Sequence, residues 1–189
     1  MNKFEAAVKA LSEGDVEFVV IGGVAVTAHG SAHVTFDLDV CYHRSRENMQ
    51  RLVNALAPYH PCLRGAPPDL AFHFDVPTVS RGLNFTLTTD LGDLDLLGEV
   101  QGIGFYPEAL ARSTTIELYG RPCSVLSLEG LIASKRAAGR TRDLVVIPEL
   151  EALRELEILR SQRAATSTRT PDKEQGATAT ERDQGDRRR

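Results

Sequence analysis

Residues 18–41 constrain the fold more than any other part of this 189-residue chain. The stretch starts with a short apolar run, passes through Gly22 and Gly23 into an Ala/Val-rich segment, and ends on Asp37-Leu-Asp39 and two further residues. Apolar runs interrupted by glycine are typical of strands that end at a turn. The order predicts a strand, a short helix, a loop and a second strand (residues 16–21, 23–29, 30–35 and 36–41).

The second of these strands predicts a pair of carboxylates on one face. Side chains alternate between the two faces of a strand, so Asp37 and Asp39 should project together while Phe36, Leu38 and Val40 pack on the other face. Adjacent carboxylates repel each other unless a cation lies between them. Oxygen ligands of this kind suit Mg²⁺, which proteins usually hold with one or two carboxylates and substrate phosphates. The alternative is an edge strand with one solvated face.

The glycine pair is the second half of the predicted site. Without Cβ atoms, Gly22 and Gly23 let backbone N–H groups approach a phosphate, and the N-terminus of the following helix adds partial positive charge. A glycine pair by itself also fits an ordinary turn. Together with the Asp-Leu-Asp strand that follows, the glycine pair becomes a specific signal for a phosphate site.

Composition is that of a single-domain enzyme of modest size. The formal net charge of −4 excludes a strongly basic nucleic-acid binder, and no run of eighteen apolar residues predicts a membrane span. The N-terminus has an amphipathic helical pattern and not that of a signal peptide. Three cysteines at unrelated spacings form no zinc or disulfide framework. We expect a cytoplasmic protein with a folded domain over residues 1–160.

The remaining pattern alternates helices and strands. Ser45 and Ser127 are predicted helix N-caps, and residues 58–70, which hold four of the nine prolines, are predicted to be an irregular loop. Residues 161–189 contain no Leu, Ile, Val, Phe, Met or Tyr and are predicted to form a disordered polar tail. The other predicted helices cover residues 2–13 and 142–160, and the other strands cover residues 83–89, 93–97, 114–119 and 121–126.

The glycine pair, the spacer and the apolar-Asp-apolar-Asp-apolar strand together resemble the signature of the nucleotidyltransferase superfamily, whose minimal fold is polymerase-beta-like. The resemblance implies an α+β (α/β) fold with a mixed β-sheet, flanking helices and a C-terminal helical part. It also implies a third carboxylate on a neighbouring strand. Asp93 and Asp95 share one face there, and Asp95, which precedes Leu96 and Leu97, fits that place better.

Residues 131–144 resemble a segment of one branch of that superfamily, the toxin nucleotidyltransferases of abortive-infection-type toxin–antitoxin pairs. The resemblance implies that Lys135 reaches the triphosphate and that Asp143 positions the lysine or the active-site loop. Thr35 matches a Ser/Thr two residues before the first aspartate, where its hydroxyl either touches phosphate or ends the loop. The Pro-rich segment 58–70 matches no motif of the family and leaves acceptor recognition open.

The resemblance implies transfer of a nucleoside monophosphate from an NTP, ATP among them, to an acceptor hydroxyl, dependent on Mg²⁺ with Mn²⁺ as an alternative. Asp37 and Asp39 would bind one or two ions, and Asp95 would complete a second ion site or take the acceptor's proton. The toxin resemblance implies an RNA acceptor, tRNA 3′ ends in particular, and an antitoxin partner. The alternatives are a small-molecule or protein hydroxyl, or a non-catalytic nucleotide- or partner-binding module.

Overall fold

The computed structural model describes residues 3–67 and 70–167. The chain divides into two compact units, Met1–Glu155 and Leu156–Arg189, and the sheet and all predicted site residues belong to the first. Within the described residues no helix combines the length and the apolar character needed to cross a membrane.

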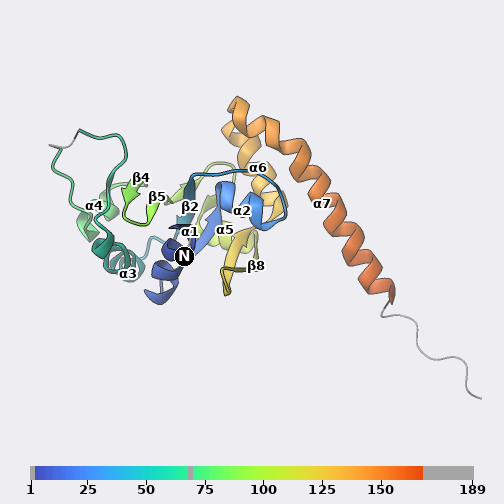
Figure 1. The fold of residues 1–189 in the computed structure, drawn as a ribbon, viewed down its shortest axis with the longest axis horizontal. Coiled ribbons are helices and arrows are strands. Elements are labelled where there is room, and N and C mark those ends of the chain that lie inside the picture. The colour runs from blue at the N-terminus through green and yellow to red at the C-terminus, as the bar shows by residue number, and fades with distance from the viewer. Residues whose placement is uncertain (1–2, 68–69, 168–189) are drawn as a thin grey trace, which may run out of the picture. The chain divides into compact units, whose positions relative to one another are not determined.

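A mixed β-sheet is the centre of the first unit (Figure 1). Among the described residues its strands follow the order β3 (Cys62–Leu63), β4 (Asn84–Thr89), β5 (Gly92–Leu97), β2 (Asp37–Tyr42), β1 (Phe18–Ile21), β9 (Arg121–Leu126) and β8 (Ser113–Leu118). The β2–β5 and β1–β9 pairs are parallel and the other neighbours are antiparallel. A separate small pair joins β6 (Glu99–Val100) to β7 (Gly104–Phe105).

Helices flank this sheet. α1 (Lys3–Glu13) and α4 (Val76–Arg81) both pack on α3 (Arg46–Leu56), which runs into the short 3-10 helix η1 (Ala57–Tyr59). α2 (Gly22–Ala28) packs on β2 and α6 (Leu128–Ala138), whereas α5 (Tyr106–Ala111) contacts β1, β2 and β9. α7 (Thr141–Ser167) follows α6. This arrangement confirms the predicted fold class: a mixed sheet, flanking helices and a C-terminal helical part.

Local signals in the sequence set the ends of several helices. The Ser45 and Ser127 hydroxyls accept hydrogen bonds from the backbone N–H groups of Asn48 and Gly130, as predicted for N-caps. Gly139 ends α6 with a φ of 64°, a left-handed conformation that glycine adopts at low cost. These caps fix the start of α3 and both ends of α6.

Three sequence predictions need correction. The 58–70 segment is not wholly irregular, because Cys62–Leu63 forms β3 against β4. Phe36 does not pack in the core: β2 begins only at Asp37, and Phe36 is 84 % exposed, whereas Leu38 and Val40 are buried. α7 continues to Ser167, so residues 161–167 are helical and not part of a disordered tail. The rest of the predicted tail lies outside the described residues.

Candidate active site

Parallel pairing of β2 with β5 brings four carboxylates together. Asp37 lies opposite Asp93 and Asp39 lies opposite Asp95, while the leucines between them are buried on the other face of the sheet. Asp37, Asp39 and Asp95 each offer an oxygen within 4.8 Å of the others. The alternation predicted from the sequence therefore gathers three carboxylates on one face of two adjacent strands.

The environment of Asp39 strongly disfavours the charged form of its carboxylate. Burial and the neighbouring charges of Asp37 and Asp95 raise its pKa to about 7, although the Gly23 backbone N–H and the charge of Lys135 oppose that rise. A bound divalent cation would relieve the repulsion, and three converging carboxylate oxygens are the hard donors that Mg²⁺ and Mn²⁺ prefer. The residues present therefore fit a divalent metal ion.

Gly22 and Gly23 leave space for the side chains of Asp39 and Thr35. Gly22 has a φ of +61°, and a Cβ there would lie 2.0 Å from Asp39 Oδ2. A Cβ on Gly23 would lie 2.5 Å from Thr35 Oγ1. In this structure the glycines thus let Asp39 and Thr35 approach the start of α2, a role that the sequence analysis did not foresee. Their predicted contact with phosphate stays a prediction.

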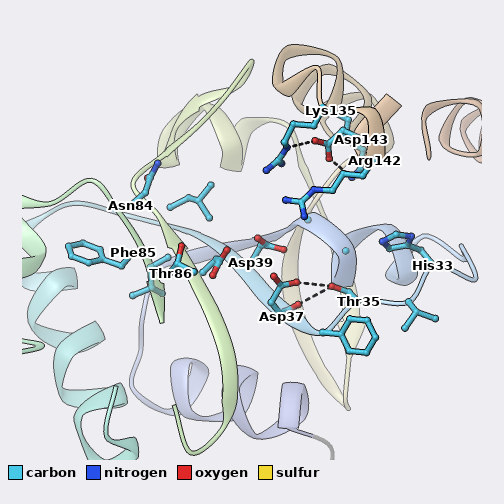
Figure 2. A pocket seen from close by; sticks show the side chains of 18 residues that line it. His33, Thr35, Asp37, Asp39, Asn84, Phe85, Thr86, Lys135, Arg142 and Asp143 are labelled. Atoms are coloured by element: carbon cyan, nitrogen blue, oxygen red, sulfur yellow. Dashed lines mark hydrogen bonds and ion pairs between the residues drawn. The ribbon is translucent and has the colours of Figure 1, made fainter. Parts of the chain in front are cut away.

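Thr35 orients the first aspartate. Its hydroxyl donates to Asp37 Oδ1 at 2.9 Å and also lies 3.2 Å from the Asp37 carbonyl oxygen (Figure 2). The hydroxyl is therefore engaged with a carboxylate of the cluster. The two roles expected from the sequence, a phosphate contact or a loop end, did not include this one.

Lys135 and Asp143 form a buried ion pair between α6 and the first turn of α7. Lys135 Nζ lies 3.4 Å from Asp143 Oδ1, and the two side chains are 14 % and 8 % exposed. Arg140 Nε donates to Asp143 Oδ2 at 2.6 Å. Burial would raise the pKa of Asp143, but the Arg140 hydrogen bond and the Lys135 charge hold it below its ordinary value. Asp143 therefore contacts Lys135, and the roles of the two residues toward a triphosphate stay predictions.

These residues line one cavity of about 490 Å³, within the range typical of small-molecule sites. In Figure 2, Lys135, Arg142 and Asp143 lie on one side of Asp37 and Asp39, and Asn84, Phe85 and Thr86 lie on the other. The cavity therefore has a basic end formed by α6 and α7 and a polar end formed by β4. Asp37 and Asp39 lie between the two ends (Figure 2), and an oxygen of Asp95 lies within 4.8 Å of theirs.

The sequence analysis missed Arg64. This residue follows β3 in the Pro-rich segment, and its guanidinium forms ion pairs with Asp37, Asp93 and Asp95. One signal pointed to it: clustered carboxylates require a cation, and the 58–70 segment, for which no role was found, contains a single arginine. Nothing local in the sequence says that β3 pairs with β4 and so brings Arg64 to β5.

Comparison with known proteins defines the fold. The sequence matches no protein-family model and no curated protein at a significant level. The crystal structure of ANT(2")-Ia in complex with adenylyl-2"-tobramycin superposes with a TM-score of 0.52 and 16% identity, over 88% of this chain and 95% of that chain. A Thermotoga maritima protein proposed to be a nucleotidyltransferase, TM1012, gives a TM-score of 0.45 and 14% identity, over 84% of this chain and 89% of that one.

The chain therefore has a nucleotidyltransferase-like fold, with an acidic triad placed to bind metal. At this level of identity the likeness defines the architecture, and the reaction has to be argued from the site. These similarities contain no link to toxin–antitoxin systems, and that part of the sequence resemblance remains a proposal.

Proposed function

We propose that the protein is a Mg²⁺-dependent nucleotidyltransferase that moves a nucleoside monophosphate from an NTP to an acceptor hydroxyl. The observation that carries the proposal is the convergence of Asp37, Asp39 and Asp95 within 4.8 Å beside a cavity with a basic end. Arg64 pairs with Asp37, Asp93 and Asp95 but forms no ion pair with Asp39. A metal–NTP complex would supply a cation beside Asp39, together with phosphates that the basic end attracts.

In this proposal Asp37 and Asp39 hold the metal, with Asp95 beside it, and the metal would neutralise charge on the phosphates of the NTP. Thr35 keeps Asp37 in place through its hydrogen bond. Asp95 accepts the proton of the acceptor hydroxyl, whose oxygen then attacks the α-phosphorus. The bond between the α-phosphorus and the bridging oxygen breaks, and pyrophosphate leaves.

Lys135 is proposed to bind the leaving phosphates. Its ammonium lies at the basic end of the cavity, close enough to Asp39 to lower that carboxylate's pKa. Asp143 holds the lysine in place. The phosphate contact of Gly22 and Gly23, which line the same cavity, is kept as part of the proposal. A compact ammonium acts here as a point charge for phosphate oxygens.

We propose an RNA acceptor, the 3′ end of tRNA, and a toxin role with an antitoxin partner. The sequence resemblance of residues 131–144 supports this choice, and so do Arg140 and Arg142, exposed cations at the cavity's basic end. A small-molecule hydroxyl is the second candidate. It is favoured by the likeness to ANT(2")-Ia, which was crystallised with adenylyl-2"-tobramycin.

The test incubates the full chain with Mg²⁺ and each α-³²P-labelled NTP, together with either tRNA or an aminoglycoside mixture. Asp37→Asn and Asp39→Asn should abolish labelling, whereas Asp90→Asn, which removes an exposed carboxylate paired with His60, should not. Label on tRNA that disappears when periodate destroys the 3′ diol supports the RNA acceptor. Label on the aminoglycoside alone supports the second candidate. Metal-dependent NTP binding with no pyrophosphate release contradicts the transferase and leaves a binding module.

A further inference from the structure

Arg64 is anchored by the sheet and not by a mobile surface loop. Its backbone N–H donates to the Thr86 carbonyl at 2.9 Å, continuing the β3–β4 ladder, and its Nη2 donates to the Leu87 carbonyl at 3.2 Å. The side chain is 27 % exposed. β4 in turn pairs with β5 along its whole length, so the position of the guanidinium is tied to the strand that carries Asp95.

The guanidinium contacts three of the four clustered carboxylates. Nη2 lies 2.6 Å from Asp95 Oδ1, Nε lies 3.2 Å from Asp93 Oδ2, and Nη1 lies 3.6 Å from Asp37 Oδ2. No ion pair of the described residues reaches Asp39. Arg64 therefore pairs directly with Asp95, Asp93 and Asp37, whereas Asp39 has no ion-pair partner among the described residues.

A second divalent cation at the β5 side would have to compete with this arrangement. It would compete for Asp95 Oδ1, which already accepts a charge-assisted hydrogen bond from Arg64, and it would lie next to a fixed positive charge. At Asp37 the obstacle is weaker, because Arg64 Nη1 lies 3.6 Å from Asp37 Oδ2, beyond hydrogen-bond distance, and Asp39 makes no contact with Arg64. Charge balance therefore favours one divalent ion together with Arg64.

We propose that Arg64 takes the place of a second divalent cation, so that this protein binds a single metal ion, at Asp37 and Asp39. The inference rests on the proposed function and decides between the one and two ions that the carboxylates alone allow. Arg64 is then a positioning residue: its hydrogen bond holds the Asp95 carboxylate in the place where a second metal ion would otherwise hold it. Unlike a metal ion, a guanidinium cannot coordinate the acceptor oxygen, so deprotonation falls to Asp95.

The test counts metal ions in the full chain without nucleotide. Mn²⁺ is titrated by calorimetry, and electron paramagnetic resonance detects the spin coupling of two neighbouring Mn²⁺ ions. We expect one ion and no coupling for the native sequence. Arg64→Gln should bind a second ion at least about tenfold more tightly than the native protein does, because the competing charge is gone. Arg64→Lys, which keeps the charge, should behave more like the native protein.

Arg121→Gln is the matched control, since Arg121 begins β9, which does not pair with the strands that carry the aspartates, and its ion pair is with Glu13. This variant should leave the metal count at one. Two spin-coupled Mn²⁺ ions in the native protein overturn the inference without any variant. The inference therefore stays testable even if circular dichroism shows that Arg64→Gln does not fold. A folded Arg64→Gln protein that still binds one ion also overturns it. Absence of Mn²⁺ binding in all four proteins overturns the proposed metal site itself, a distinct result.

Discussion

Gly22→Ala should displace the Asp39 carboxylate. A Cβ at this position would lie 2.0 Å from Asp39 Oδ2, whereas ordinary contact begins at 3.4 Å, so the oxygen has to move by about 1.4 Å, the difference between the two distances. A misplacement of roughly 1 Å at a catalytic group can lower the rate by about 100-fold. We expect that loss in nucleotidyl transfer, together with Mn²⁺ binding weaker by about tenfold or more.

The backbone contribution can be separated from the clash. Gly22 has a φ of +61°, where an L-residue costs about 1 kcal/mol in stability. Gly120 has a φ of +76° in the β8–β9 turn and nothing within 4 Å of its Cβ position. Gly120→Ala should therefore lower the melting temperature by roughly 2–4 °C for a chain of this length, with no effect on metal binding or activity.

Calorimetric Mn²⁺ titration, transferase assays and thermal melts of both variants test this reasoning. Gly22→Ala should lose more stability than Gly120→Ala and should be alone in losing metal affinity. If Gly22→Ala binds Mn²⁺ and transfers nucleotide like the native protein, the close packing of Asp39 against α2 does not set the geometry of the site, and the argument is refuted.

Three further predictions follow from the same geometry. Because the pKa of Asp39 rises from 3.8 to about 7 on folding, the metal-free folded state retains a proton that the unfolded chain has lost; stability should fall as pH rises through this window. In thermal melts with EDTA, the melting temperature of Asp39→Asn should therefore increase relative to that of the native protein as pH rises. A difference in melting temperature that does not change with pH would contradict this. Asp95→Asn should abolish transfer while Asp93→Asn retains at least about a tenth of the rate, since Asp93 lies outside the triad; equal losses would show that Asp93 also takes part. Asp143→Asn should cost about 3 kcal/mol in denaturant unfolding and raise the KM for NTP, because it breaks a buried pair. The exposed-pair control Glu151→Gln should change stability by about 0.5 kcal/mol or less, and similar effects of the two would refute the assigned role.

The sequence by itself determined the local parts of this protein. Alternation in Asp37-Leu-Asp39 placed the carboxylates on one face, because strand side chains alternate with a period of two that any sequence displays directly. The same period in residues 93–97 placed Asp93 and Asp95 on one face of their own strand, and the resemblance pointed to Asp95. Ser45 and Ser127 marked helix starts through a hydrogen bond that reaches only three residues along the chain. Resemblance then pointed to Lys135 and its partner Asp143.

Only the tertiary structure decided which of these local parts meet. Phe36 was assigned to the core by the alternating pattern, but β2 starts one residue later and leaves it exposed. Arg64 entered the acidic cluster because β3 pairs with β4, which pairs with β5, a chain of contacts between segments far apart in sequence. Gly22 proved to be a neighbour of the Asp39 side chain. Periodicity and capping depend on nearby residues, whereas strand pairing depends on the free energy of packing the whole sheet, which no single stretch of sequence contains.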